Sequence, residues 1–336
     1  MARIGIIIIV LGVLVAGAAS LAKQYYEADG PLEERIIVHI AKGSGVGAIA
    51  DRLKFEGVIS SEDAFKVAAR LRGDGGQLKA GDYEFDPGVS LKGVMDALVD
   101  GKSVEYRITV AEGLTTAEAL DLVKENKVLV GEITSKPAEG ALAPDTYFVQ
   151  RGETRDAVVE RMKSAQAKIL AQAWENRVEG LPIKSPVEAL ILASIIEKET
   201  GVASERREVA SVFVNRLRKG MKLETDPTVI YGITRGAGPL GRELTRKDVR
   251  TPTDYNTYSI TGLPPTPIAN PGKASIEAAV NPATTPYFFF VADGTGGHGF
   301  SKTLAEHNRK VAKWRKIRAK QRAEERRARA AAQAKN

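Results

Sequence analysis

The chain has 336 residues, of which 43% are hydrophobic, 27% are charged and none is cysteine. This length and composition favour one large or two modest folded domains, and they exclude a disulfide scaffold, a cysteine nucleophile and a cysteine-ligated metal site. The net charge of +7 does not indicate nucleic-acid binding, because residues 309–336 hold 12 Lys and Arg against two Glu, which leaves a net charge of −3 on the rest of the chain.

Residues 4–22 form an apolar segment without a charge at the start of the chain. As a helix this segment is about 28 Å long, close to the hydrocarbon thickness of a bilayer, roughly 30 Å. Small residues at 17–20 leave a cleaved signal peptide as the alternative, but the segment exceeds the usual length of such signals. We therefore predict that residues 1–23 form a single-pass transmembrane anchor that exports the rest of the chain. The flanking charges do not decide its orientation.

Residues 24–35 are polar, contain Asp29-Gly30-Pro31 and are predicted to be a linker. The next segment, residues 36–103, alternates turn residues with periodic apolar patterns. These patterns predict a strand at 36–40, helices at 46–55 and 61–72, a strand at 81–85 and a helix ending near 98. A strand, helix, helix, strand module of this size resembles the LysM type of glycan-binding domain.

Residues 104–312 are predicted to form a second, mixed α/β domain. Its predicted elements are a strand at 104–110, a helix at 115–123, an aromatic strand reached through a turn at 142–148, and helices at 155–176, 185–200 and 204–220. The 185–200 helix has well-marked ends. Ser185-Pro186-Val187-Glu188 has the pattern of a capping box with proline at the first helical position, and Gly201 marks the end.

Two glutamates, Glu197 and Glu199, lie at the end of this apolar helix. Helical spacing places Glu199 on one stripe with Leu192, Ile195 and Ile196, whereas Glu197 falls on another face. A carboxyl at the edge of an apolar wall tends to have a raised pKa and can stay protonated near neutral pH, as a general acid must. From periodicity alone, a frayed last turn with solvated glutamates is an equally good interpretation.

After Gly220 the composition shifts toward Thr, Pro, Asn, Tyr and Gly, at residues 225–228, 251–258 and 262–265. We expect these stretches to be loops rich in hydroxyl, amide and aromatic groups. Sugars require that mixture, because their hydroxyls need donors and acceptors and their ring faces stack on aromatic side chains. Ordinary turn-rich connections explain the composition equally well.

A series of motifs identifies a known family. The motifs follow one another at residues 193–200, 203–206, 209–217, 225–231, 255–258, 262–265, 290–294, 297–300 and 306–308. Over roughly residues 36–310 the chain closely resembles the endolytic murein transglycosylase family, also called YceG-like. The resemblance implies an α+β protein with an N-terminal transmembrane helix in the bacterial inner (plasma) membrane, a LysM-like βααβ subdomain, and a mixed α/β catalytic domain on the periplasmic side.

The resemblance also implies the chemistry. The catalytic residue of the family is the second glutamate of the Glu-Lys-Glu-Thr motif, which is Glu199. As the single acid and base it would cleave the β-1,4 bond between N-acetylmuramic acid (MurNAc) and N-acetylglucosamine (GlcNAc) in nascent glycan strands, leave 1,6-anhydro-MurNAc ends and limit strand length. The residues expected to position the sugar or tune Glu199 are Glu205, Asn215, Asp226, Tyr231, Tyr255, Asn256 and Tyr258. No cofactor is expected, and the three histidines lack metal-ligand spacing, so no metal is expected either.

The expected partners are peptidoglycan glycan strands and the membrane, and the resemblance suggests peptidoglycan synthases of the penicillin-binding class. Residues 313–336 form a basic tail, predicted to be a solvated or frayed helix, with an anionic membrane surface or an acidic wall polymer as the alternative ligand. Two other functions stay open: an anchored scaffold that binds the wall without cutting it, and a nucleic-acid-binding membrane protein, which requires steep salt dependence.

Overall fold

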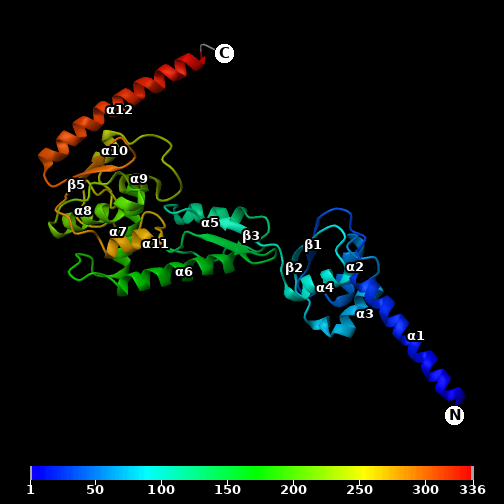
Figure 1. The fold of residues 1–336 in the computed structure, drawn as a ribbon. Helices are drawn as coiled ribbons and strands as arrows, with labels where there is room; N and C mark the ends of the chain where they lie inside the picture. The colour runs from blue at the N-terminus through cyan, green and yellow to red at the C-terminus, as the bar shows by residue number, and fades with distance from the viewer. Residues whose placement is uncertain (1, 334–336) are drawn as a thin grey trace. The chain divides into compact units, whose positions relative to one another are not determined.

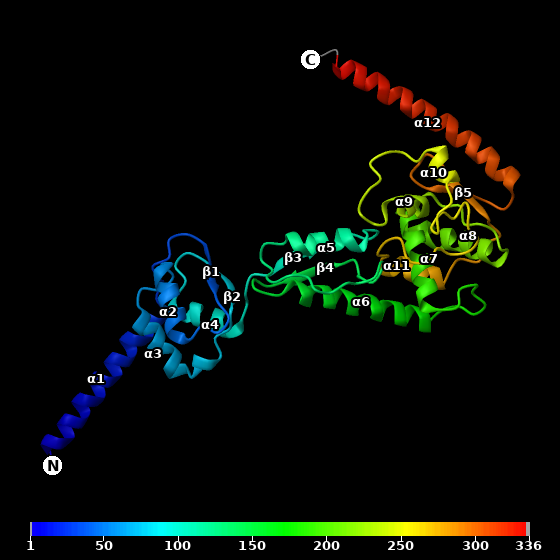
Figure 2. The same cartoon turned by 180° about the vertical axis from the view of Figure 1, so that it is seen from behind.

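The structure is a computed structural model that describes residues 2–333, and the chain divides into two compact units (Figures 1 and 2). Unit 1 comprises Met1–Arg107 and Phe148–Glu153, and unit 2 comprises Ile108–Tyr147 and Thr154–Asn336. The chain passes between the units in strands β3 and β4, which pair with each other. The observed division therefore falls a few residues after the predicted one at 103, and the return of residues 148–153 to unit 1 was not predicted.

Unit 1 has the predicted order of a strand, two helices and a strand. Its elements are α1 (Ala2–Glu27), β1 (Ile36–Ile40), α2 (Val46–Phe55), α3 (Glu62–Arg72), the 3-10 turn η1 (Asp74–Gly76), β2 (Gly81–Phe85) and α4 (Leu91–Asp100). Strands β1 and β2 pair antiparallel, with Val38 opposite Tyr83. Both side chains are buried in the core of the unit, together with Phe65 from α3 and Met95 from α4. The element order is confirmed, whereas the relation to LysM domains stays a prediction.

Helix α1 contains a segment, Ile9–Glu27, that is long and apolar enough to cross a membrane. The helix runs past the predicted end of the anchor at residue 23, and Tyr26 packs against the core of unit 1. The residues predicted as a linker are also held in place. The Gly30 N–H donates to the Gly88 carbonyl at 3.2 Å, and a Cβ on Gly30 would lie 2.2 Å from the Val89 carbonyl oxygen, so only glycine fits there.

The buried carboxylate of Asp82 explains why residues 148–153 belong to unit 1. Its side chain is 1% exposed and accepts hydrogen bonds from His39 Nδ1 at 2.6 Å, Tyr106 Oη at 2.5 Å and Arg151 Nε at 2.6 Å. Since a buried carboxylate is costly unless it is paired and hydrogen-bonded, these partners are held firmly. The first residue of β3 and the segment after β4 are thereby joined to the β1–β2 pair.

Unit 2 is mainly helical, with one β-hairpin. It contains parts of β3 (Tyr106–Thr109) and β4 (Thr146–Val149), then α5 (Thr116–Glu125), α6 (Arg155–Glu175), α7 (Pro186–Glu199), the 3-10 turn η2 (Ala203–Glu205), α8 (Arg206–Arg218), α9 (Asp226–Thr234), α10 (Arg246–Arg250), α11 (Lys273–Val280), β5 (Phe289–Ala292), β6 (His298–Ser301) and α12 (Leu304–Gln333). The hairpin of β5 and β6 was not among the predicted elements. The segment predicted as a loop at 225–228 instead begins α9, with Pro227 in its first turn.

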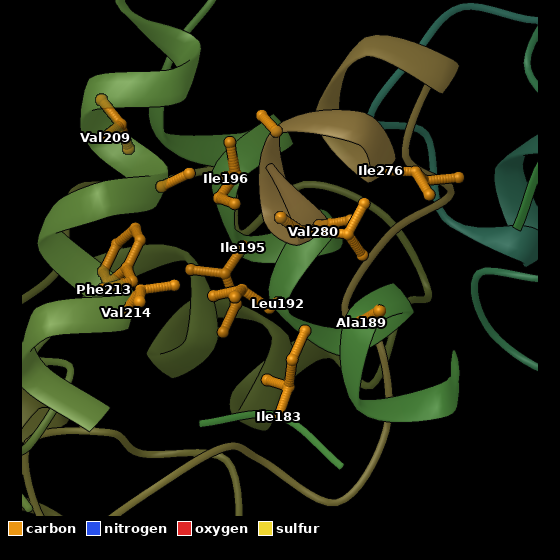
Figure 3. Packing of buried hydrophobic residues seen from close by; sticks show 14 of the residues in the cluster. Ile183, Ala189, Leu192, Ile195, Ile196, Val209, Phe213, Val214, Ile276 and Val280 are labelled. Atoms are coloured by element: carbon orange, nitrogen blue, oxygen red, sulfur yellow. The ribbon is translucent and has the colours of Figure 1, made fainter. Parts of the chain in front are cut away.

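Helix α7 lies in the middle of this unit. Leu192, Ile195 and Ile196 are fully buried, and Figure 3 shows them between Phe213 of α8 and Val280 of α11. Apolar residues surround the helix rather than forming one stripe, which is the pattern of a helix buried on all sides. The core of unit 2 therefore fixes α7, and with it the position of the last helical residue.

Helix α12 contains the basic tail. It begins at Leu304, earlier than the tail predicted from residue 313. Its first turns pack against the hairpin, where Ile317 lies so near Gly294 that a Cβ there would come within 2.9 Å. Farther along, Arg318 and Arg322 pair with Glu243 at 3.2 and 3.0 Å. The predicted solvated helix is thus present, with its beginning anchored on unit 2.

Candidate active site

Local sequence signals set both ends of α7. Ser185 accepts a hydrogen bond from the Glu188 N–H at 3.2 Å, and Pro186 stands at the first helical position, as predicted. The capping box is incomplete, because the Glu188 carboxylate accepts from the Lys184 N–H instead of the Ser185 N–H. At the other end, Thr200 adopts an extended backbone and ends the helix directly after Glu199. A carboxyl group therefore terminates an apolar helix whose position is fixed by the core.

The Glu199 carboxyl is held by one neighbouring hydroxyl. Thr225, which is 2% exposed, donates its hydroxyl to Oε1 of Glu199. Burial raises the pKa of the Glu199 carboxyl above its ordinary value, the bond from Thr225 lowers it, and the charges of Asp226 and His298 raise and lower it respectively. Because burial is the largest of these effects, the protonated form is favoured at a higher pH than for an exposed glutamate. This is the property that a general acid requires.

Glu199 opens into a cleft of about 430 Å³. The cleft is bordered by the segment before α9, by Tyr258, by strand β5 and by the first turn of α12, and its lining residues are Glu199, Phe213, Arg216, Leu223, Glu224, Thr225, Asp226, Tyr258, Phe289, Phe290, Val291, Leu304 and His307. Carboxylates, hydroxyls and aromatic rings thus share one cavity. This is the mixture that suits a sugar, whose hydroxyls need hydrogen bonds and whose ring faces pack on apolar surface.

Asp226 and Tyr258 form a pair beside Glu199. The Tyr258 hydroxyl donates to Oδ1 of Asp226 at 2.8 Å. Burial raises the pKa of the Tyr258 hydroxyl, and the Asp226 carboxylate raises it further, so this group stays a neutral donor. The structure therefore brings these two predicted residues into the cleft with Glu199, as their sequence positions alone could not show.

Glu205 reaches the site through a histidine of the hairpin. Oε2 of Glu205 lies 2.9 Å from Nδ1 of His298, and Oε1 accepts the His298 backbone N–H at 3.0 Å. A Cβ on Gly297 would lie 2.5 Å from that same Oε1, so glycine is required for this close approach. Glu205 thus positions His298, whose charge acts on Glu199. Sequence reasoning gave His298 no role, although it stands within the Gly-His-Gly-Phe motif.

Arg216 is a second residue of the cleft that the sequence did not single out. Its side chain is 8% exposed and donates to the carbonyls of Phe288 and Leu223 at 2.7 and 3.1 Å and to the Glu224 carboxylate at 3.0 Å. It therefore joins the residue before strand β5 to the segment that carries Thr225. The two sides of the cleft are held together by one guanidinium group.

Two of the predicted residues, Tyr231 and Tyr255, lie together at another place in unit 2. Their ring centroids are 4.9 Å apart, and the Tyr231 hydroxyl donates to Glu139 at 3.1 Å. The Tyr255 hydroxyl lies 2.8 Å from the Thr266 hydroxyl. Neither residue lines the cleft that contains Glu199. Their part in sugar binding stays a prediction.

The two predicted asparagines make hydrogen bonds with the backbone. Asn215 donates to the carbonyls of Thr285 and Tyr287 at 2.9 and 3.0 Å, which fixes the chain before β5. Asn256 is fully buried, and its Oδ1 accepts the Tyr258 N–H at 2.9 Å. The geometry gives both residues a positioning role, and for Asn256 that role acts directly on Tyr258.

Glu197 corrects the helix-face interpretation. Its side chain is only 6% exposed, although periodicity had placed it away from the core-facing stripe. Oε2 accepts the Gly272 N–H at 2.9 Å, next to α11, and Oε1 lies 3.9 Å from Arg206. The reason is that the segments carrying Gly272 and Arg206 cover Glu197, whereas Lys198 in the same turn is exposed. Glu197 is a structural carboxylate and not a solvated one.

Comparisons with known proteins show which proteins this chain resembles. The chain matches the model of the YceG-like family over residues 38–313. It is 32% identical to the endolytic murein transglycosylase of Bacillus subtilis, over 90% of this chain and 91% of that protein. The endolytic murein transglycosylase of Streptococcus pneumoniae strain D39 is 26% identical, over 84% of this chain and 59% of that longer protein. A crystal structure of a YceG-like protein from Listeria monocytogenes is 31% identical, with a TM-score of 0.50 over 82% of this chain and 99% of that one.

Proposed function

This chain belongs to the YceG-like family, and we propose that this lytic murein transglycosylase cleaves the β-1,4 bond between MurNAc and GlcNAc inside nascent glycan strands. The single observation that carries the proposal is the carboxyl group of Glu199, which has a raised pKa and opens into a cleft lined by polar and aromatic groups. The names of the relatives support the murein substrate and the endolytic mode. Such cuts would limit the length of the strands.

The first chemical step uses Glu199 as an acid. Its proton passes to the glycosidic oxygen while the bond from that oxygen to C1 of MurNAc breaks, so GlcNAc leaves with a neutral hydroxyl. Oε1 is engaged by Thr225, and the described residues offer Oε2 no hydrogen bond. Oε2 is therefore the oxygen placed to exchange the proton with the substrate. General acid catalysis of this kind contributes about 10²–10⁴-fold to a rate.

The second step uses the same group as a base. The Glu199 carboxylate takes the proton of the C6 hydroxyl while O6 forms a bond to C1 of the same sugar, which closes the 1,6-anhydro ring and regenerates the acid. No water enters, and the nucleophile is already part of the bound sugar, so its approach costs little additional entropy. A hydrolase would need a second carboxylate as base or nucleophile.

The neighbours of Glu199 tune these two steps. The Thr225 hydroxyl stabilises the carboxylate formed after the first step, and the positive charge that His298 can carry acts in the same direction. Asp226 acts in the opposite direction and favours return of the proton. Tyr258 holds Asp226 by its hydroxyl and offers a ring to the cleft. Burial thus favours the acid form that the first step uses, and Thr225 and His298 stabilise the carboxylate that the second step uses.

The location completes the proposal. We infer that α1 anchors the chain in the bacterial plasma membrane by a single pass and that both units lie on its outer side, where nascent glycan is found. The Ile9–Glu27 segment of α1 is long and apolar enough for this. Peptidoglycan synthases of the penicillin-binding class are the proposed neighbours, because they would supply the strands that this enzyme cuts.

Mass spectrometry of purified glycan strands after digestion tests the reaction. We expect every new end to be a 1,6-anhydro-MurNAc residue, with the summed mass of the products equal to that of the substrate. A hydrolase would add about 18 Da of water per cut and leave a reducing end. Fragments of intermediate length should appear first, because the cuts are internal. Reducing ends would exclude the transglycosylase mechanism, and uncut strands would favour the scaffold function.

A matched variant separates one-carboxylate from two-carboxylate chemistry. Asp226→Asn keeps an oxygen that can accept the Tyr258 hydroxyl, so the cleft should keep its shape. The proposed mechanism predicts that this variant loses about tenfold in rate at most, as expected for a residue that only tunes an acid. A loss as large as that of a Glu199 variant would instead identify Asp226 as a second catalytic carboxylate.

A further inference from the structure

Helix α3 carries two apolar stripes, and the core of unit 1 uses only one of them. Phe65 and Ala69 are 0% and 1% exposed and face the core. Val67 and Leu71, four residues apart on another face, are 53% and 82% exposed. A helix at the surface of a soluble unit needs only one apolar stripe. The core of unit 1 therefore leaves the second stripe of α3 uncovered.

This second stripe lines an apolar groove together with the end of α1. The groove has a volume of about 380 Å³, and its apolar lining is formed mainly by Ala22, Tyr25 and Tyr26 of α1 and by Ala64, Val67 and Leu71 of α3. Arg72 donates to the Tyr26 hydroxyl, and Tyr26 packs against the core of the unit. The last turn of α1 and the outer face of α3 thus border the same groove.

The position of this groove along α1 sets its depth relative to a membrane. Residues 4–22 are the uncharged segment, and at 1.5 Å per residue they span about 28 Å, nearly the whole hydrocarbon core. Ala22 then falls at the hydrocarbon boundary, and Lys23 to Tyr26 fall in the headgroup layer, which is roughly 5–7 Å thick on each side. Tyrosine and lysine are well suited to that layer. A groove that contacts Ala22 and Tyr25 must lie at the same depth.

We propose that the outer face of α3, with Val67 and Leu71 at its centre, rests in the headgroup layer of the membrane and seats unit 1 on the lipid. The inference depends on the anchor of the proposed function but not on the catalytic reaction. Leu71 follows Arg70 in the last turn of α3, so an apolar side chain enters the layer with a cation beside it, whereas Arg72 is paired with Asp74 and Asp96 of unit 1. This arrangement fits lipids with anionic headgroups, as in other helices that lie in the membrane surface.

The experiment uses the full chain in vesicles of phosphatidylcholine and phosphatidylglycerol. Because the chain has no cysteine, a single one can be introduced and labelled with an environment-sensitive fluorophore. The test variant is Leu71→Cys. The control is Ile37→Cys on β1, an apolar position that is 48% exposed and does not line the groove. Quenching is measured with aqueous iodide and with lipids that carry a quencher near the headgroup.

We expect the label at position 71 to be quenched by the lipid and several-fold less by iodide than the label at position 37. Equal quenching by iodide at the two positions would overturn the proposal. Protection that disappears when the protein is diluted in lipid would assign the face to a second copy of the chain. Protection found in native membranes but absent in pure vesicles would assign it to another membrane protein.

Two further measurements on the same samples keep the proposals apart. A chain that does not float with the vesicles overturns the anchor and the lipid surface together, while its cleavage of glycan strands still reports on the catalytic proposal. Conversely, loss of cleavage with lipid quenching unchanged at position 71 would overturn the function and leave the lipid surface standing. Cleavage by the Leu71→Cys variant should equal that of the unaltered chain, because Leu71 is not part of the catalytic cleft.

Discussion

Replacing Glu199 with glutamine tests the central inference most directly. The amide has nearly the same shape as the carboxyl group, and its oxygen can still accept the Thr225 hydroxyl. The proton that the carboxyl group donates and recovers is lost, since an amide cannot exchange it at the same pH. The variant should therefore keep the shape of the cleft and lose the reaction.

The substitution should change both turnover and stability. General acid or base catalysis contributes about 10²–10⁴-fold, and the proposed mechanism uses Glu199 in both steps, so we expect a loss of about 10⁴-fold or more in kcat, or about 5.5 kcal/mol in activation free energy. The free energy of unfolding, in contrast, should stay the same or increase. Because burial raises the pKa of Glu199, the stabilisation from its proton is present below the ordinary pKa and is lost as the pH rises through the raised pKa. A glutamine at this position does not titrate, so its contribution to stability does not fall as the pH rises.

The assay measures both quantities on the same preparations. Turnover is followed as the appearance of 1,6-anhydro ends on purified strands. Thermal unfolding is recorded over a series of pH values that begins near the ordinary pKa of glutamate, about 4.3, and continues upward. The Glu199→Gln variant should melt at the same or a higher temperature than the unaltered protein, with the larger difference at the higher pH.

Glu197→Gln is the matched control, two residues away on the same helix. Its side chain is 6% exposed and accepts the Gly272 N–H at 2.9 Å, with Arg206 nearby. Removing that charge should lower the free energy of unfolding by about 1–3 kcal/mol and leave turnover within about tenfold. The reasoning fails if Glu199→Gln keeps more than about one hundredth of the turnover, or if Glu197→Gln loses as much.

Three other changes have expected outcomes. Thr225→Val removes the hydrogen bond that lowers the pKa of Glu199, so the alkaline limb of the kcat/KM profile should move to higher pH. Thr225→Ser keeps a hydroxyl and should return that limb to its original pH. If the limb does not move in Thr225→Val, the Thr225 hydroxyl does not tune Glu199. Arg216→Lys should lower the free energy of unfolding, measured in urea, by about 3–5 kcal/mol, because one ammonium group cannot replace the several hydrogen bonds of a buried guanidinium. A decrease of less than about 1 kcal/mol would contradict the proposed link across the cleft. Deleting residues 1–23 should give a soluble protein that still cuts soluble strands, since Tyr26 and its contacts remain, and a folded but inactive truncated protein would show that the anchor takes part in catalysis.

The sequence alone determined the features that depend on neighbours along the chain. The limits of α7 followed from Ser185, Pro186 and Gly201, because caps and breakers act within one helical turn. The alternation of β1, α2, α3 and β2 followed from apolar periodicity for the same reason. The position of Glu199 at the end of a core helix, and the resemblance of the motifs around it, were also present in the sequence.

Tertiary structure decided what surrounds that carboxyl group. Thr225 lies 26 positions from Glu199 along the chain, and His298 lies 93 positions from Glu205, so no local pattern could pair them. The same holds for Glu197: periodicity placed it on a different face from the apolar stripe, and contacts with distant segments bury its side chain. Apolar spacing reports which residues a helix can bury, whereas the partners of a polar group depend on which distant segments the core brings together. The acidity of Glu199 is therefore a property of the folded chain, set by burial and by a hydroxyl from another helix boundary.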